Sequence, residues 1–296
     1  MTASILELSK KRTVLLDGGM GSELIKRGLP QGACPEQWND IQPDQVRGIH
    51  SAYFDAGSDA VLTNSFGGNA VKLSSYGLEK QCYDINLKSA RLAKEICPKG
   101  KWVGGSMGPT GKFLKPYGGY SPEQFEEAYA EQVRGLGDGG VDFLLIETQY
   151  DLNEALCALR GARGHFAGEI FITMTFNQTP RGFFTIMGNS LTQCSRVLEE
   201  NDIPAFGANC TLDSKGMADL IKKWRRETPS PLIAQANAGQ PVPGENGSVQ
   251  YTQSPEEYVQ YVRSIIENGA DIIGGCCGTD PAFIRRMADV LIAQVK

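Results

Sequence analysis

The sequence has few histidines, no long apolar run and little clustered positive charge, and each shortage excludes a class of protein. No stretch reaches the roughly 18 uninterrupted apolar residues that a membrane-spanning helix needs, and Met1–Arg12 has no apolar region followed by a small-residue cleavage site. The net charge is −5, and the basic runs Lys10–Arg12 and Lys222–Arg226 look like solvated helix or helix-end positions. We therefore predict a cytosolic protein that binds neither membranes nor nucleic acids.

The eight cysteines are too sparse for a disulfide framework in a chain of 296 residues, so free thiols are expected. Cys210 and the vicinal pair Cys276-Cys277 are candidates for a shared site, because a vicinal disulfide is strained and leaves Cys210 unexplained. The other five lack an evident partner and are interpreted as small buried apolar residues: Cys34, Cys82, Cys97, Cys157 and Cys194.

Glycine, in contrast, is abundant, with 35 residues. Their spacing is aperiodic, which excludes collagen, and too little serine and proline surrounds them for a linker. With 41% apolar and 21% charged residues, the composition is that of a globular protein. The length allows either two ordinary domains or one (β/α)8 barrel, a fold that takes about 250 residues.

Short apolar runs recur eight times, each followed by turn residues and then by a longer stretch with helical spacing. Because eight parallel strands close a barrel, we predict an α/β protein with a single (β/α)8 TIM barrel, one domain over residues 1–296. The predicted strands are Val14–Asp17, Ala60–Ser65, Trp102–Ser106, Phe143–Glu147, Ile170–Phe176, Ala205–Cys210, Leu232–Ala236 and Ile272–Gly275.

The connections between helices and strands repeat in the same way. Gly57, Gly140 and Gly269 each separate a helical stretch from a strand, which suits a left-handed glycine at a helix end. The stretch Gly239–Gly247 is interpreted as a long loop after the seventh strand. No stretch has the composition of a linker between domains.

The carboxyl ends of the strands are where TIM barrels carry their catalytic residues. Cys210 closes the sixth strand and Cys276-Cys277 close the eighth, so three thiols can converge on one face. Neighbouring residues of an extended strand point to opposite sides, so the pair can bind one ion only if the backbone turns, and Gly274-Gly275 and Gly278 allow a turn. Three thiolates leave one position of a tetrahedral zinc open, which is typical of a catalytic site and can hold a substrate thiol without its proton.

The two histidines, His50 and His165, lie in predicted helices away from the strand ends, so imidazole acid–base catalysis is not expected. Two other classes of protein stay open. A phosphate-binding barrel lyase or isomerase would suit the glycine-rich loops near strands seven and eight, but it requires a lysine or histidine at a strand end, and we find none. A zinc-binding or redox-sensing scaffold without catalysis would need a fourth protein ligand, and no further cysteine or histidine closes a strand.

An ordered set of short motifs runs through the chain: Leu15–Gly21, Asp55–Asp59, Thr63–Asn69, Gly104–Pro109, Gly207–Cys210, Asn237–Gly239 and Gly274–Thr279. Together they resemble the homocysteine S-methyltransferase family, the zinc-dependent barrels that move a methyl group onto homocysteine to make methionine. The resemblance covers nearly the whole chain. The sequence looks most like the bacterial betaine-type members and the homocysteine-binding domain of cobalamin-dependent methionine synthase.

This resemblance implies that Cys210, Cys276 and Cys277 bind zinc and that Glu147 and Asp17 lie near the amino group of homocysteine. The chemistry agrees, because an ammonium group at a barrel mouth favours a neighbouring carboxylate, and Glu147 closes the fourth strand. The three cysteines and Glu147 are the predicted catalytic residues.

Other strand-end residues complete the predicted substrate site. We expect backbone amides around Gly18-Gly19 and Ser106–Gly108 to bind the substrate carboxylate, and Asn209 and Asn237 to orient the metal ligands. With Asp17 and Glu147, the predicted substrate-binding residues are Gly18, Gly19, Thr63, Ser65, Ser106, Asn209, Asn237 and Trp38.

Trp38 is the predicted contact of the methyl donor, because an indole ring near the barrel mouth attracts an ammonium or sulfonium group with roughly 2 kcal/mol. The chain ends at Lys296 without the folate and cobalamin domains of the large methionine synthases, so we expect it to bind its donor directly. A betaine-like onium compound is the first choice, and direct displacement is the expected reaction. The alternatives are S-methylmethionine, S-adenosylmethionine or a corrinoid protein that delivers the methyl group. A homo-oligomeric state is also among the predictions.

Overall fold

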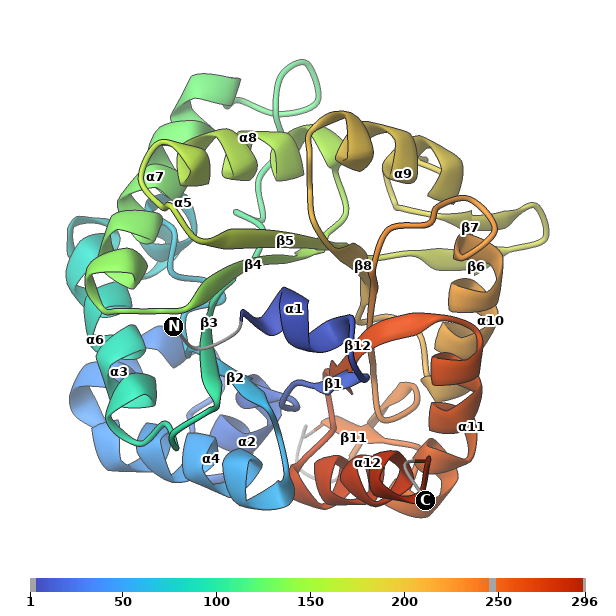
Figure 1. Ribbon diagram of the computed structural model, residues 1–296. Helices are drawn as coiled ribbons and strands as arrows, with labels where there is room; N and C mark the ends of the chain where they lie inside the picture. The colour runs from blue at the N-terminus through green and yellow to red at the C-terminus, as the bar shows by residue number, and fades with distance from the viewer. Residues whose placement is uncertain (1–3, 245–248, 295–296) are drawn as a thin grey trace.

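The computed structural model describes residues 4–244 and 249–294. Eight parallel strands follow one another in the order β1-β12-β9-β8-β5-β4-β3-β2 and curl into a nearly closed barrel (Figure 1). Between the two end strands, the amide of Asp59 donates to the carbonyl of Leu15 at 2.6 Å. The architecture confirms the predicted (β/α)8 TIM barrel. The strands are β1 Val14–Leu15, β2 Ala60–Leu62, β3 Trp102–Met107, β4 Phe143–Gln149, β5 Glu169–Met174, β8 Phe206–Asn209, β9 Leu232–Ala236 and β12 Ala270–Gly275.

All eight strands lie where apolar runs predicted them, but β1 and β2 end earlier than expected. The predicted strands extended to Asp17 and Ser65, whereas the observed ones stop at Leu15 and Leu62. Past the end of β1, the Asp17 carboxylate accepts a hydrogen bond from the amide of Leu62 at 2.8 Å. The Asp17 side chain thus accepts an amide of β2 that a main-chain carbonyl of the neighbouring strand would otherwise accept. The pairing of the two strands ends at this point.

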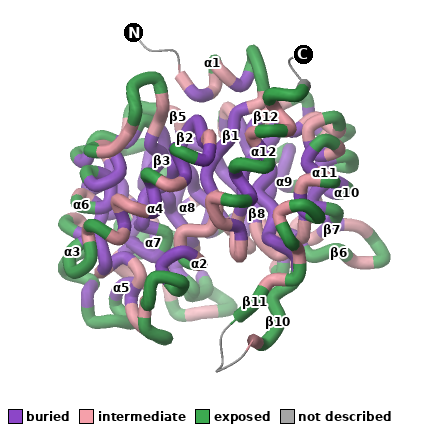
Figure 2. The backbone as a smooth tube through the Cα atoms, turned by 90° about the horizontal axis from the view of Figure 1, so that it is seen from below, coloured by how far each residue is buried: buried purple, intermediate pink, exposed green. Residues whose placement is uncertain are grey.

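The barrel interior is filled by apolar side chains at the amino ends of the strands. The short helix α1 (Ile5–Ser9) lies over the centre of the barrel in Figure 1, and Ile5, which is 1% exposed, packs into this interior cluster. Phe143 and Phe171 of the same cluster have ring centroids 5.4 Å apart. In Figure 2, α1 and the hairpin of β10 and β11 lie at opposite ends of the barrel. One end of the barrel is therefore closed by a helix.

A layer of helices surrounds the strands. Their buried faces join the outward side chains of the strands in the largest apolar cluster. Gly57, Gly140 and Gly269 have φ values of 113°, 88° and 106°, so the predicted left-handed glycines between helices and strands are confirmed. The long helices are α2 Met20–Lys26, α4 Pro43–Ala56, α6 Cys82–Glu95, α7 Pro122–Asp138, α8 Leu152–Arg163, α9 Leu191–Glu200, α10 Ser214–Trp224, α11 Pro255–Glu267 and α12 Pro281–Gln294; the short ones include α3 Trp38–Ile41 and α5 Ala70–Leu73.

Two short hairpins extend from the carboxyl ends of the strands, and neither was predicted. The first pairs β6 (Asn177–Thr179) with β7 (Gly182–Phe184), and the second pairs β10 (Pro241–Pro243) with β11 (Val249–Tyr251). Strand β10 of the second hairpin lies within the predicted loop Gly239–Gly247, of which residues 245–247 lie outside the described part of the chain.

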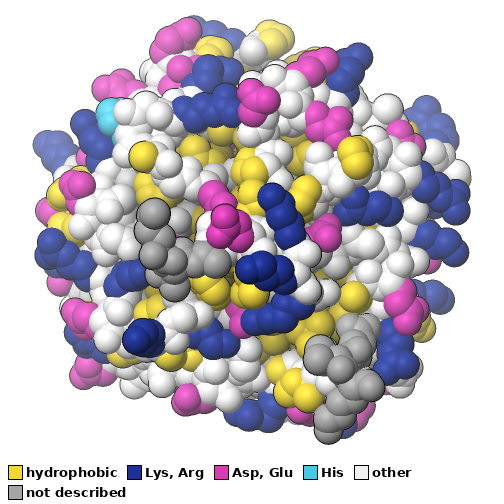
Figure 3. Space-filling model, viewed as in Figure 1, with side chains coloured by type: hydrophobic (Ala, Val, Ile, Leu, Met, Phe, Trp, Pro, Cys, Tyr) yellow, Lys and Arg dark blue, Asp and Glu magenta, His cyan; other side chains and the backbone are white. Residues whose placement is uncertain are grey.

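On the face that carries α1, basic and acidic side chains are interspersed (Figure 3). Within residues 4–244 and 249–294, no helix has both the length and the apolar character to cross a membrane.

Candidate active site

A cavity of about 330 Å³ opens among the carboxyl ends of the strands. Three carboxyl groups line it, those of Asp17, Glu36 and Glu147, together with the three thiols of Cys210, Cys276 and Cys277. Among the described residues around the cavity, none is lysine, arginine or histidine. The lining therefore favours a positively charged or zwitterionic ligand over a phosphate.

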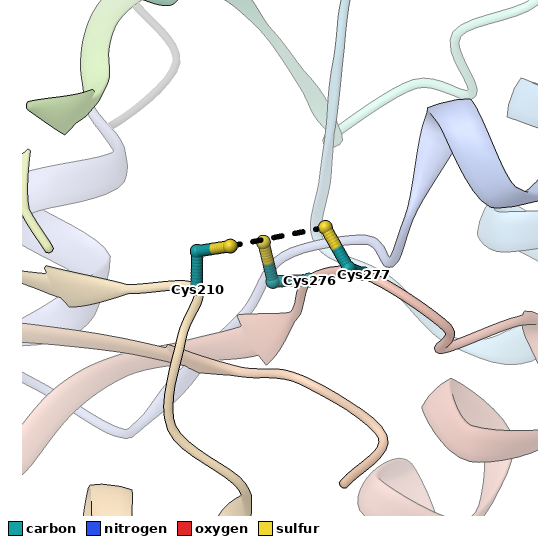
Figure 4. A group of neighbouring side chains, drawn as sticks. All are labelled: Cys210, Cys276 and Cys277. Atoms are coloured by element: carbon teal, nitrogen blue, oxygen red, sulfur yellow. Dashed lines mark hydrogen bonds between the residues drawn. The ribbon is translucent and has the colours of Figure 1, made fainter. Parts of the chain in front are cut away.

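The three predicted cysteines come together at one side of this cavity. Cys210 follows β8, Cys276 and Cys277 follow β12, and the side chains point toward one another (Figure 4). The Sγ atoms of Cys210 and Cys277 are 3.8 Å apart, and all three sulfurs lie within 4.8 Å of one another. Residues that are 66 positions apart in the chain thus form one cluster, as the strand order predicted.

The backbone at both segments is turned so that the thiols meet. After β12 ends at Gly275, Gly278 adopts a left-handed conformation with φ of 81°, which agrees with the predicted turn. At the other segment the turn is made without glycine, because Cys210 and Thr211 have φ values of 63° and 59°. Such conformations cost of order 1–3 kcal/mol for a residue with a Cβ atom. The backbone at Cys210 and Thr211 is therefore strained in the conformation that brings the thiols together.

The cluster has the dimensions of a tetrahedral metal site. Zinc–sulfur bonds of about 2.3 Å place two thiolates of a tetrahedron about 3.8 Å apart, which matches the Cys210–Cys277 separation of 3.8 Å. Hydrogen bonds from Cys276 and Cys277 lower the pKa of Cys210, and the same contacts raise the pKa of both donors. A divalent cation bound by the cluster would favour the thiolate form of all three.

Asparagine side chains support the cluster from two strands. Nδ2 of Asn209, at the end of β8, lies 3.9 Å from Sγ of Cys276. Oδ1 of Asn237, directly after β9, accepts a hydrogen bond from the amide of Cys277 at 3.2 Å. Both residues are buried, and they contact the cysteine segment at a sulfur atom in the case of Asn209 and at a main-chain amide in the case of Asn237. Their role in orienting metal ligands stays a prediction.

The same Asn209 side chain connects the thiols to Glu147. Its Nδ2 donates to Oε2 of Glu147 at 3.2 Å, and Oγ of Ser106 donates to Oε1 at 2.5 Å. Thr148, the next residue, has a left-handed φ of 58° and donates its amide to Oδ1 of Asn209 at 2.8 Å. Burial raises the pKa of Glu147 to about 7, which a neighbouring cation would lower again.

Asp17 provides a second carboxyl group in the cavity. It is 1% exposed; Oδ2 accepts the amide of Leu62, whereas Oδ1 has no hydrogen-bond partner among the described residues. Burial holds the pKa of Asp17 well above its usual range, and the charge of Glu147 adds to the shift. An unpartnered carboxyl oxygen beside a cavity suits the ammonium group of a ligand.

Thr63 and Ser65 line the cavity and position Ser106. Oγ1 of Thr63 accepts the amide of Ser106 at 3.0 Å, Oγ of Ser65 donates to the Ser106 carbonyl at 2.8 Å, and the two hydroxyls are 2.6 Å apart. Since Ser65 uses its proton on the carbonyl, Thr63 is the donor between the two hydroxyls. The chain of bonds ends on Glu147 through Ser106.

Comparisons with known proteins show the family to which the chain belongs. The sequence model of the homocysteine S-methyltransferase family matches residues 14–291. The chain belongs to this family. It is 31% identical over 312 residues to a methionine synthase of Mycobacterium tuberculosis and over 304 residues to that of Mycobacterium leprae, with 99% and 96% of this chain aligned. The alignments cover 26% and 25% of those relatives, so the chain spans about a quarter of their length.

Solved structures show the same fold. The metallated form of the homocysteine methyltransferase MmuM from Escherichia coli superposes with a TM-score of 0.79 at 24% identity, over 96% of this chain and 98% of that one. A methyltransferase from Methanosarcina mazei gives a TM-score of 0.61 at 10% identity, over 96% and 95%. This family differs from the phosphate-binding lyases and from the non-catalytic scaffolds, the two other classes that the sequence left open.

Of the predicted substrate contacts, Trp38 is wrong, and the prediction for the Gly18-Gly19 amides remains for Gly18 alone. Trp38 is 6% exposed, begins α3 and packs in the largest apolar cluster instead of lining the cavity, because α3 folds back onto α4 and α6. Gly18 and Gly19 do line the cavity, but the Gly19 amide donates to the Thr279 carbonyl at 3.0 Å. It is therefore not available to a substrate carboxylate.

The amides of the third strand are engaged as well. The amide of Ser106 donates to Thr63, and the amide of Gly108 donates to the carbonyl of Phe66 at 2.8 Å. These bonds tie β3 to the segment after β2. The predicted role of Ser106–Gly108 in binding a carboxylate through its amides is therefore not what the structure shows, whereas the Ser106 hydroxyl does reach the site.

Several residues of the lining are not among the predicted site residues, and three of them carry an acidic or aromatic side chain: Glu36, Phe66 and Tyr251. Glu36 accepts the amide of Gly67 on Oε1 at 2.6 Å and is contacted on Oε2 by the Cys34 thiol at 3.2 Å. Phe66 directly follows the predicted end of the second strand and is 40% exposed, so its position beside a strand end was the available signal. Nothing in the spacing of Tyr251 pointed to the cavity.

Proposed function

We propose that the protein transfers a methyl group from an onium donor to the sulfur of homocysteine and so makes methionine, with zinc bound by Cys210, Cys276 and Cys277. The observation that carries the proposal is the convergence of these three thiols in a cavity whose lining is acidic. We propose further that residues 1–296 act as one homocysteine-binding barrel, located in the cytosol, and that homo-oligomers form.

The bound ion would hold the substrate sulfur as a thiolate at its fourth position and so supply the nucleophile. The remaining tasks belong to side chains of the protein. Asp17 and Glu147 bind the ammonium group of homocysteine, since both are buried and Oδ1 of Asp17 lacks a partner. Ser106 and Asn209 keep the Glu147 carboxylate in place. Fixing the amino acid in this way aims its sulfur at the donor, which contributes through orientation.

An onium donor fits the chemistry of the opposite wall. Phe66, whose ring is partly exposed, and Glu36 both line the cavity, and Glu36 accepts the amide of Gly67, the residue after Phe66. A carboxylate beside an aromatic ring attracts a cationic methyl donor. As the new C–S bond forms, the old bond between methyl and the onium atom breaks and leaves its electron pair on that atom. A neutral amine or thioether departs, so the reaction needs no general acid.

Glycine betaine remains our first choice of donor, and S-methylmethionine and S-adenosylmethionine share the same onium chemistry. A second candidate is a corrinoid methyl carrier. It is favoured by the 31% identity to methionine synthases that are about four times as long as the aligned region.

The test uses purified protein of known metal content, homocysteine and one donor at a time: glycine betaine, S-methylmethionine, S-adenosylmethionine or methylcobalamin. We expect about one zinc per chain and methionine formation with one of the three onium donors. Methionine from methylcobalamin alone would favour the second candidate. No methionine with any donor would refute both.

The Cys276→Ala variant separates the metal site from the fold. It should lose stoichiometric zinc and methyl transfer. Cys97→Ala is the matched control, because Cys97 lies in the loop after α6, away from the cavity. Methionine formation by Cys276→Ala at the rate of Cys97→Ala would overturn the assignment.

A further inference from the structure

Gln235 is a buried polar side chain in the floor of the cavity. It is the one polar residue of β9 (Leu232–Ala236). Because successive side chains of a strand point to opposite sides, Gln235 points the same way as Ile233, which packs in the apolar cluster of the barrel interior. Gln235 is 2% exposed and lines the cavity. It therefore lies where the apolar interior of the barrel meets the active-site cavity.

The main chain fixes Gln235 between the two segments that carry the thiols. It lies opposite Asn209 of β8 on one side and opposite Gly274 of β12 on the other. Its carbonyl accepts the amide of Cys210 at 3.1 Å. Cys210 directly follows Asn209, and Cys276 follows Gly274 by two residues. The place of Gln235 beside the thiol cluster is thus set by the strand ladder.

Gly274 leaves room between Gln235 and the segment that carries Asp17. A Cβ atom on Gly274 would be 3.2 Å from Cγ of Gln235, 2.9 Å from Cβ of Leu16 and 3.1 Å from the carbonyl oxygen of Asp17. Since glycine has no side chain, β12 places none between these groups. The amide of Gly275 donates to the carbonyl of Asp17 at 2.8 Å and holds that segment against β12. Gln235 and Asp17 thus reach the cavity from the two sides of Gly274.

The Gln235 amide lacks the hydrogen bond that a buried acceptor requires. Its Oε1 has no hydrogen-bond partner among the described residues, and the same is true of Oδ1 of Asp17. Within the described lining of the cavity, these two are the buried side-chain oxygens without a partner. A buried acceptor without a donor destabilises a folded protein. Two of them in one cavity indicate a ligand that brings at least two hydrogen-bond donors.

We propose that Gln235 is a further substrate-binding residue: its Oε1 accepts an N–H of the ammonium group of homocysteine, beside Asp17 and Glu147. The inference rests on the proposed function, which places homocysteine in this cavity. An ammonium group has three N–H donors, and the three side chains supply three acceptors. A neutral amide suits the third position, because a third carboxylate would add negative charge to a buried site that already holds two carboxyl groups and three thiols.

This contact makes Gln235 important only for thiols that carry an amino group. Homocysteine and 4-sulfanylbutanoate share the thiol and the carboxylate, but only homocysteine has the ammonium group. Calorimetry on the zinc-loaded protein without a methyl donor measures the binding of each ligand. The comparison separates the ammonium contact from the contacts of the thiol and the carboxylate.

Gln235→Met keeps the length of the side chain and removes the acceptor. Loss of a hydrogen bond to a charged group weakens binding by about 10–100-fold, so homocysteine should bind this variant more weakly by that factor. The affinity for 4-sulfanylbutanoate should not change. Gln235→Glu keeps an oxygen in the same place and should bind homocysteine as tightly as the control Gln193→Met. Gln193 is exposed in α9, outside the cavity lining.

Chemical denaturation of the ligand-free variants tests a purely structural role. Gln235→Met should be at least as stable as Gln193→Met, since the amide oxygen that it removes has no partner in the fold. A large loss of stability would mean that the fold itself uses the amide, and it would overturn the inference.

The binding data decide between this inference and the proposed function. Equal homocysteine affinity in Gln235→Met and Gln193→Met would overturn the inference while leaving methyl transfer intact. Equal losses for both ligands would also overturn it, because they would place the contact at the carboxylate or the thiol. A loss confined to homocysteine would support it even if no tested donor yields methionine. Unmodified protein that binds neither ligand would overturn both proposals.

Discussion

Two buried aspartates at opposite ends of the barrel show how differently the ends are built. Asp59 precedes β2, and its carboxylate contacts Arg12 at 2.7 Å, Lys101 at 3.1 Å and the amide of Leu15 at 3.1 Å. Burial alone would raise the pKa of Asp59, but the hydrogen bonds from Arg12 and Leu15 lower it overall. Asp17, past the other end of β1, accepts one amide on Oδ2, and its Oδ1 has no hydrogen-bond partner among the described residues. The Asp59 carboxylate is thus fully engaged within the fold, whereas Asp17 keeps an oxygen that we propose for the substrate.

The residues with a left-handed backbone conformation also differ between the two ends of the barrel. Left-handed positions before β2, β4 and β12 are filled by Gly57, Gly140 and Gly269. Near the cavity, the left-handed residues carry side chains: Thr148 lies near the end of β4, and Cys210 and Thr211 follow β8. Strain in a fold collects where side chains must take a set geometry. The contrast indicates that the end with α1 is built for stability and the other end for the site.

Ile5→Ala should have the largest effect on stability alone. Ile5 is 1% exposed and packs α1 into the barrel interior, and truncation of such a side chain typically costs about 2–5 kcal/mol. Chemical denaturation should show that loss, while kcat/KM per folded molecule stays unchanged. A loss of zinc or of activity in folded Ile5→Ala would break the division between the two ends.

The aspartate pair sharpens the comparison directly. Asp59→Asn loses charge-assisted bonds and should destabilise the protein by about 1.5–3 kcal/mol without changing catalysis. Asp17→Asn keeps an oxygen for the amide of Leu62 and removes a buried carboxyl group whose Oδ1 has no partner among the described residues. Stability should therefore stay level or rise, while kcat/KM for homocysteine falls by about 10–100-fold. Chemical denaturation gives the change in unfolding free energy of each variant, and steady-state kinetics give the change in kcat/KM. Equal losses of stability in the two variants would contradict the contrast.

The same contrast explains which parts of the site could be predicted from the sequence. The strands follow from apolar runs, and the thiol cluster follows from strand ends, because parallel strands of a barrel place their carboxyl ends on one face. Trp38 and Tyr251 were misplaced or missed, since periodicity does not encode the path of a loop after it leaves a strand. The turn at Cys210 was invisible because no glycine marks it. Strained positions break the local rules on which sequence reasoning depends.

A buried histidine in the helix layer makes stability depend on pH. His50 in α4 is fully buried, neither ring nitrogen has a partner among the described residues, and burial lowers its pKa from 6.5 to about 4. The unfolded chain therefore takes up a proton below pH 6.5 that the folded protein does not, and stability falls as the pH drops from 6.5 toward 4. Between pH 7 and pH 5 this amounts to about 2 kcal/mol.

The His50→Phe variant tests this linkage, because it keeps a ring in α4 that cannot take up a proton. Between pH 7 and pH 5, the unfolding free energy of His50→Phe should fall less than that of the unmodified protein. The difference between the two falls should be about 2 kcal/mol. His165→Gln is the control, because His165 is exposed and should leave the pH dependence unchanged. Parallel pH profiles for His50→Phe and His165→Gln would refute the assignment.

The smallest expected effect concerns Asp202, the left-handed non-glycine residue between α9 and β8. Its φ is 50°, and it lies at the end of the barrel where other connections between a helix and a strand have glycine in the left-handed conformation. Asp202→Gly should relieve the strain and raise the unfolding free energy by about 1 kcal/mol, with no change in zinc content or kcat/KM. Gly140→Ala is the mirror experiment, because φ is 88° there and a Cβ atom would meet no neighbour within 4 Å. Its loss of about 1 kcal/mol would come from the backbone alone. If Asp202→Gly instead lowered activity, strain at this end would also serve the site, and the division drawn from Asp17 and Asp59 would fail.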